Sequence, residues 1–179
     1  MKIKLFAVGL LALLLVGAAG PSFAGRANAA APSAHVASAT ASHATFLDKT
    51  RFLAHAGIAF FAIHHEYRRY REGYFNSGAA HRVRNIATAA AVLLLGYHEA
   101  AVAYGIAEKS NSKTLHAFAS PINALVSGMA AVRGRLTKRQ FNASDLTNLN
   151  NQTFSINNLG RQNGAGSISD VSVPLPSDS

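Results

Sequence analysis

Three residues of this sequence, His55, His98 and Glu99, have side chains that could hold a metal ion or a haem. A turn is expected near residues 76–77, and His55 and His98 are almost equally far from it. Both arms of an antiparallel helical hairpin rise about 1.5 Å per residue, so the two histidines should share one depth. Neutral imidazole ligates divalent metals and haem iron, and Glu99 could ligate or orient a ring. The alternative is that these histidines make hydrogen bonds that fix the register of the helices.

A second candidate site is the turn region itself, which is rich in arginine and tyrosine. Guanidinium groups bind phosphates and carboxylates through paired N–H donors. The alternative is a solvated helix end, where tyrosine rings cover the core and arginines pair with Glu66 and Glu72. The predicted anion-binding surface consists of Tyr67, Arg68, Arg69, Tyr70, Arg71, Arg82 and Arg84.

Other chemistry has little support in the sequence. The chain has no cysteine, which excludes disulfides, thiolate metal sites and cysteine nucleophiles. It also has no GxSxG or HExxH motif and no paired Glu-x-x-His motif. We therefore predict a non-enzymatic protein with no cofactor, with a divalent metal or haem at the histidines as the alternative.

The elements that must position these residues are three helices. Apolar residues at three- and four-residue steps predict a first helix from about residue 46 or 48 to 72. A second, from about 79 to 108, is apolar all round at its centre, as in a central buried helix. A third, from about 113 to 136, follows a short turn, so neighbouring helices should be antiparallel. The sequence predicts an all-α protein, an antiparallel three-helix bundle built on a helical hairpin.

The two ends of the chain differ in composition from this helical core. A basic start, an apolar run from residue 5 to 19 and small residues before a cleavage point predict a signal peptide at residues 1–24. Residues 25–45 have the Ala, Ser and Thr composition of a disordered linker, and 46–139 form the three-helix domain. Residues 140–179, rich in Asn, Ser and Gly, are predicted to be a disordered tail.

The positive charge belongs to the helical core. Residues 46–139 hold thirteen Lys or Arg against five Asp or Glu, whereas 141–179 hold one Arg against three Asp. For an exported protein, the anionic partners are a membrane surface or another envelope component rather than nucleic acid. We expect a secreted or envelope-associated protein that acts through this basic surface. A homo-oligomer is a further possible partner.

The same helices can also be interpreted as spans of the plasma membrane. The basic residues of the first turn and those after the third helix would share one side, as the positive-inside rule requires. Against this, the first helix has only residues 52–63 free of formal charge, and the second carries Glu99 near its middle. An integral three-span protein is therefore the alternative to a soluble or surface-attached bundle.

The segments FLAHAGIAFFAIHHEYRRYREG, GYHEAAVAYGIAEKS and SPINAL resemble small exported helical proteins of unknown function from actinobacteria. The likeness covers about residues 50–130. His55, His64 or His65, and the pair His98 and Glu99 stand at the positions most alike. The resemblance implies export and a helical hairpin, and it implies no activity.

Overall fold

The computed structural model describes residues 34–175, with side chains from residue 46 onward. The described part is all-helical, which confirms the predicted class, and it contains no strand. The predicted signal peptide and the first part of the predicted linker lie outside the described residues. The helices are α1 (Ala34–Arg71), α2 (Arg82–Lys109), α3 (Lys113–Thr137) and α4 (Ala143–Gln162).

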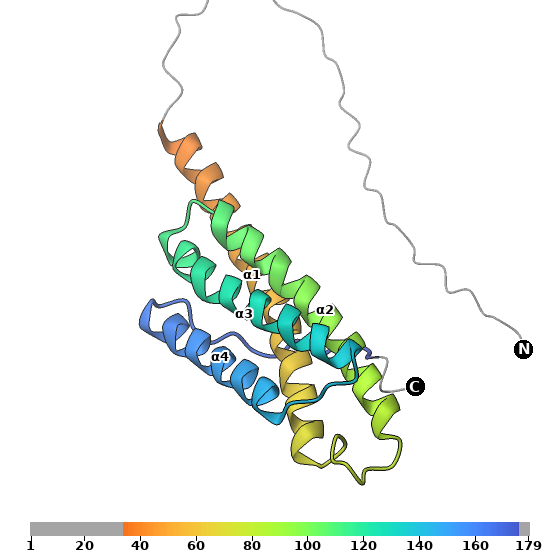
Figure 1. Ribbon diagram of the computed structural model, residues 1–179. Coiled ribbons are helices and arrows are strands. Elements are labelled where there is room, and N and C mark those ends of the chain that lie inside the picture. Colours follow the sequence, from red (N-terminus) through yellow and green to blue (C-terminus); the bar gives the residue numbers. More distant parts are fainter. Residues whose placement is uncertain (1–33, 176–179) are drawn as a thin grey trace, which may run out of the picture. The chain divides into compact units, whose positions relative to one another are not determined.

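The predicted hairpin forms the centre of the fold (Figure 1), where α2 packs against both α1 and α3. Large side chains of α1, among them Phe52, Phe60 and Ile63, are buried in the core with Leu93 of α2. Gly96 allows the close approach of α2, because a Cβ atom there would lie 2.6 Å from Met129 Cε and 2.9 Å from Ala62 Cβ. The position of α2 between two helices accounts for the part of its apolar centre that is buried, whereas Ala91 and Leu94 of the same stretch are exposed.

The third helix follows its prediction closely. Its side chains at three- and four-residue steps are buried along one face, and Ser112 accepts a hydrogen bond from the backbone N–H of Leu115 at its start. The buried face consists of Leu115, Phe118, Ile122, Leu125, Met129 and Val132.

The predicted disordered tail is wrong for residues 143–162, which form α4. The side chain of Asn142 caps the start of this helix by accepting from the backbone N–H of Ser144. Leu146, Leu149 and Ile156 are buried where α4 packs against α1 and α3. The described residues thus form four helices where the sequence predicted three, because the stripe of α4 has enough apolar surface to dock despite the polar composition around it.

The chain then returns across α1 without helix or strand. The backbone N–H of Val171 donates to the carbonyl of Gly57, 3.1 Å away. A Cβ atom at Gly57 would lie 2.5 Å from Ser169 O, so only glycine allows the segment so close. Leu175 is buried with Ala62 and Val92, between α1 and α2. We name residues 164–175 the C-terminal strap.

The predicted linker is also partly wrong, because residues 34–45 belong to α1. These residues are rich in alanine, which has the highest helix propensity, so they continue the helix toward the N-terminus. Among the residues of α1 whose side chains the structure describes, Phe52 is the first that is buried, close to the start that the apolar pattern predicted.

Candidate functional site

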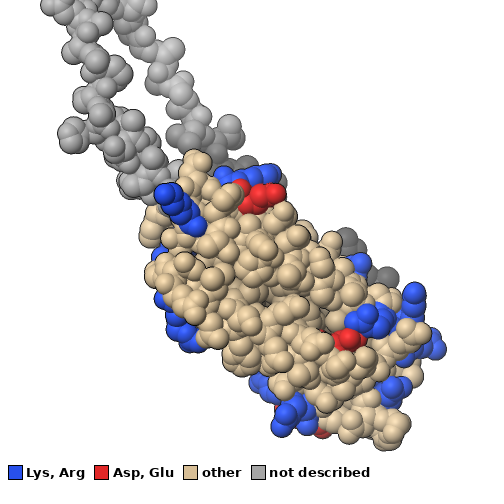
Figure 2. Space-filling view, turned by 60° about the vertical axis from the view of Figure 1, so that its left-hand side comes forward, with Lys and Arg blue, Asp and Glu red and all other residues tan. Residues whose placement is uncertain are grey.

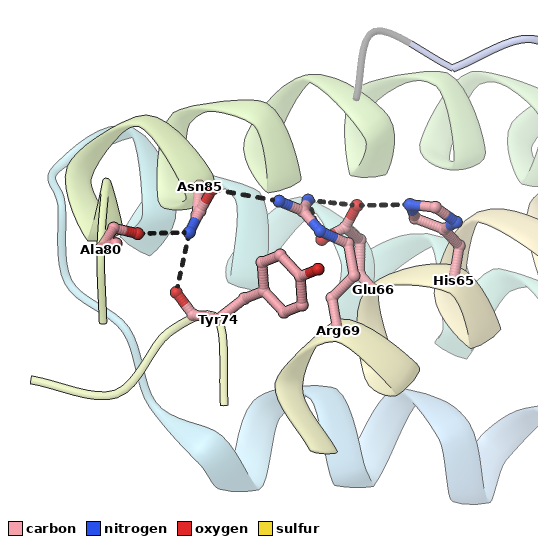
Figure 3. A network of polar contacts seen from close by, with 6 residues as sticks. All are labelled: His65, Glu66, Arg69, Tyr74, Ala80 and Asn85. Carbon is pink, nitrogen blue, oxygen red and sulfur yellow. Dashed lines mark hydrogen bonds and ion pairs between the residues drawn. The ribbon is translucent and has the colours of Figure 1, made fainter. Parts of the chain in front are cut away.

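The carboxyl group of Glu66 is buried near the end of α1, with no exposed surface (0%). Arg69, one turn further on, donates from Nη1 to both carboxyl oxygens at 3.1 and 3.2 Å. Nε2 of His65 lies 3.7 Å from Glu66 Oε1 (Figure 3). A pairing of Glu66 with a nearby arginine was part of the alternative prediction for this region, in which the helix end is solvated rather than a binding surface.

This pair connects α1 to α2 through Asn85. Arg69 Nη2 lies 3.4 Å from Asn85 Oδ1, and Asn85 Nδ2 donates to the carbonyls of Tyr74 and Ala80 at 3.1 and 3.2 Å. Figure 3 shows the chain of contacts from Glu66 to the turn. The guanidinium of Arg69 also stands 5.2 Å from the centre of the Tyr74 ring. The network therefore fixes the conformation of the turn between α1 and α2.

Burial raises the pKa of Glu66 from 4.5 to about 7, because the apolar surroundings disfavour the charged carboxylate. The charge of Arg69 and its hydrogen bond oppose this shift and do not cancel it. Glu66 therefore changes its charge near neutral pH.

The structure divides the predicted anion-binding surface into three groups. Arg68, Arg71 and Arg84 are exposed, whereas Arg69 is engaged by Glu66, and Arg82 donates from Nε to the carbonyl of Phe75 at 2.9 Å. The two remaining members, Tyr67 and Tyr70, pack against the core with ring centres 6.0 Å apart. The tyrosines thus cover the core, and the exposed arginines remain available to anions.

The loop between α3 and α4 adds basic residues to the same end of the bundle. The ring of Phe141 lies 4.9 Å from that of Phe75 and 5.8 Å from that of Tyr70, so this loop and the α1–α2 turn meet. Lys138 and Arg139 of this loop are exposed. We name the exposed cations of this end the basic end: Arg68, Arg71, Arg84, Lys138 and Arg139.

Carboxylates do little to neutralise the basic end. Glu66 is buried against Arg69, and Asp145 is held by Arg135 through two contacts of 2.7 Å. Glu72 is the remaining, exposed carboxylate of the α1–α2 turn. Figure 2 shows several Lys and Arg side chains gathered at the lower right of the visible face, beside a broad uncharged area. This end therefore presents a positive potential to solvent.

The predicted metal site is only partly assembled. His55 Nδ1 donates to Glu99 Oε2 across α1 and α2 at 2.6 Å, so these two residues do share one depth. His98 is exposed. Within residues 46–175, whose side chains the structure describes, there is no group of three or more His, Cys, Asp or Glu residues arranged to hold a metal ion. The observed role of His55 is the one in the alternative, a hydrogen bond between helices.

A cluster that the sequence did not reveal joins α1, α4 and the C-terminal strap. His64 Nδ1 lies 2.9 and 2.8 Å from the two carboxyl oxygens of Asp170, and its Nε2 lies 2.9 Å from Thr153 Oγ1. The hydroxyl of Thr153 also lies 2.7 Å from the carbonyl of Asn150, to which it can donate. The carboxylate–imidazole–hydroxyl order is that of a hydrolase triad. Thr153, however, has no exposed surface (0%), so a substrate carbonyl cannot reach it, and the cluster acts as a clasp for the strap.

The sequence contained a signal for α4 but none for this clasp. Leu146, Leu149, Thr153 and Ile156 follow the spacing of a helical stripe, which the Asn-rich composition obscured. His64 and Asp170 are 106 positions apart, and no local pattern relates residues at such a separation.

Two of the described helices, α2 and α3, are long and apolar enough to cross a membrane. Helix α1, the first of the three predicted spans, is not one of them. Helices buried in the core of a soluble protein have the same length and composition, and α2 lies between α1 and α3.

Comparison of the chain with protein-family models, with curated proteins and with solved structures found no match. The function is therefore argued from the geometry of the chain itself.

Proposed function

We propose that this chain is an exported, non-enzymatic helical protein that acts at the cell envelope by binding an anionic component through its basic end. The proposal rests on how the charged residues of this end are distributed between exposed and paired positions. Five cations are exposed, while the carboxylates of Glu66 and Asp145 are already paired with arginines. Export rests on the apolar run and cleavage pattern of residues 1–24.

The rigidity of the support favours binding over a merely solvated surface. The turn between Arg71, the last residue of α1, and Arg84, in the first turn of α2, is held by the Asn85 hydrogen bonds and by the Phe75–Phe141 contact. Cations on a backbone of fixed conformation lose less conformational entropy when they bind an anion than cations on a mobile loop do.

The test is the binding of the purified protein to vesicles of phosphatidylglycerol and phosphatidylcholine. Each Lys or Arg near an anionic surface contributes about 1 kcal/mol, so binding should be strong at low salt. It should weaken steeply as the ionic strength rises, because the Debye length falls to about 8 Å at 0.15 M salt. No binding at low salt, or binding that salt does not change, would contradict the proposal.

A second candidate is an integral membrane protein, and the length and composition of α2 and α3 favour it. Against it stands the carboxyl group of Glu99 in α2. Insertion scales give a free-energy cost of about 2.5 kcal/mol or more for an acidic residue at the centre of a span. Extraction of membranes with alkaline carbonate separates the two candidates. A peripheral protein is released into the supernatant, whereas an integral protein stays with the membrane.

A further inference from the structure

An apolar groove runs between α2 and α3 beside the basic end. It consists of two adjoining hollows of about 330 and 360 Å³, which share Ala87, Ala90 and Thr137 as lining residues. Val83 and Leu94 flank the groove on α2 and are 54% and 47% exposed, although both are large and apolar. This apolar surface is open to solvent in the described part of the chain, where a ligand can reach it.

Cations stand around this groove. Arg139 lines the first hollow and Arg133 the second, where the Arg133 guanidinium is held 5.3 Å from the centre of the Tyr97 ring. Arg84 is exposed one helical turn before Ala87, on the same face of α2. Among the described residues, no carboxylate lines either hollow. The groove therefore combines an apolar floor with a cationic rim.

We infer that this groove holds part of an acyl chain of an anionic phospholipid, whose phosphate lies against Arg84, Arg133 and Arg139. The inference rests on the proposed function and names its ligand more closely. Hydrophobic contact and attraction to anionic headgroups together determine the strength with which a protein binds a lipid surface. A wall polymer or a nucleic acid would use the arginines and leave the apolar floor uncovered.

A tryptophan reporter tests the groove directly, because the chain has no tryptophan of its own. In Leu94→Trp the indole lies at the groove, and in Ala124→Trp it lies at an exposed position of α3 that lines neither hollow. With phosphatidylglycerol vesicles we expect the indole emission of Leu94→Trp to shift to the blue, and to be quenched when the lipids are brominated along the acyl chain. The emission of Ala124→Trp should change much less.

A pair of charge-neutral variants tests the contribution of the groove to affinity. Ala87→Gln with Ala91→Gln places amide groups in it, and Ala117→Gln with Ala124→Gln makes the same change at exposed positions of α3 outside it. The first pair should weaken vesicle binding about tenfold through loss of acyl contact, and the second should leave it unchanged. Binding of inorganic polyphosphate, which has no acyl chain, should be the same for both pairs.

The outcomes separate this inference from the proposed function. Suppose that vesicle binding depends on salt, but brominated lipids do not quench Leu94→Trp and the two glutamine pairs bind with equal affinity. This result contradicts acyl-chain binding in the groove and leaves anion binding by the basic end in place. No vesicle binding by the wild-type protein at low salt overturns both.

Discussion

The imidazole Nδ1 of His64 lies 2.8 Å from the carboxyl Oδ2 of Asp170, which joins the C-terminal half of α1 to the last part of the described chain. Because the Nε2 of the same ring lies 2.9 Å from the Thr153 hydroxyl of α4, one side chain connects three segments. The C-terminal strap is therefore held by side chains as well as by the Val171–Gly57 backbone hydrogen bond.

Removal of the carboxylate from this clasp should loosen the strap. For Asp170→Asn we expect a loss of about 1 kcal/mol in the free energy of unfolding, because the Asp170 side chain is partly exposed and solvent weakens the pair. Urea denaturation measures this loss, and hydrogen exchange of the Val171 amide should become faster. Glu72→Gln removes an exposed carboxylate from the α1–α2 turn and should change neither quantity. Equal effects of the two substitutions would contradict the clasp.

Two glycines in helices should respond in opposite directions to alanine. At Gly57 the new Cβ would lie 2.5 Å from Ser169 O and 2.7 Å from Val171 Cγ2, so Gly57→Ala should displace the strap and cost about 1–3 kcal/mol. At Gly105 nothing lies within 4 Å, so Gly105→Ala should stabilise the protein by about 0.5–1 kcal/mol through helix propensity. Thermal unfolding gives both values, and stabilisation by Gly57→Ala would show that the strap does not pack on α1.

The raised pKa of Glu66 predicts a pH dependence of stability. Between 4.5 and about 7 the folded protein keeps a proton that the unfolded chain has lost. The free energy of unfolding therefore falls as pH rises through this range, by up to about 3 kcal/mol, and the stabilisation is fully present only below pH 4.5. Urea denaturation of wild type and Glu66→Gln across pH 4–8 measures the effect as the difference between the two proteins. A difference that stays constant with pH would show that Glu66 ionises normally.

The helices with a regular spacing of apolar residues could be predicted from the sequence. The features that depend on contacts between distant residues could not. The stripe from Leu115 to Val132 is strictly helical in spacing, and α3 forms where it indicated. In α4 the stripe is diluted by asparagine and serine, residues of turns and disordered segments, so composition outweighed spacing in the prediction. The division of the arginines was also beyond the sequence. Only the fold shows that Arg69 faces a buried carboxyl group while Arg68 beside it faces solvent.

The prediction that residues equally far from the turn share one depth was right for His55 and Glu99. It was not sufficient to predict which side chains meet at one site. His55 and Glu99 meet as expected from their distances to the turn. The rotation of α2 about its axis turns His98 to solvent, and counting residues from a turn gives depth without rotation. A site on neighbouring residues such as His98 and Glu99 is difficult to predict, because successive residues of a helix point about 100° apart.

The central claim, that the basic end binds an anionic surface, is tested most directly by comparing two triple variants of equal charge. Arg68→Gln, Arg71→Gln and Arg84→Gln remove exposed cations from the basic end, and Arg51→Gln, Lys109→Gln and Lys113→Gln remove the same number of exposed cations at the opposite end. Both sets leave the paired residues Glu66 and Arg69 intact. The measurement is the dissociation constant for phosphatidylglycerol-containing vesicles at low salt. At about 1 kcal/mol per arginine, the first variant should bind about a hundredfold more weakly than wild type, and the second should lose much less. Equal losses in the two variants would show that net charge alone drives binding, and would contradict a site at the basic end.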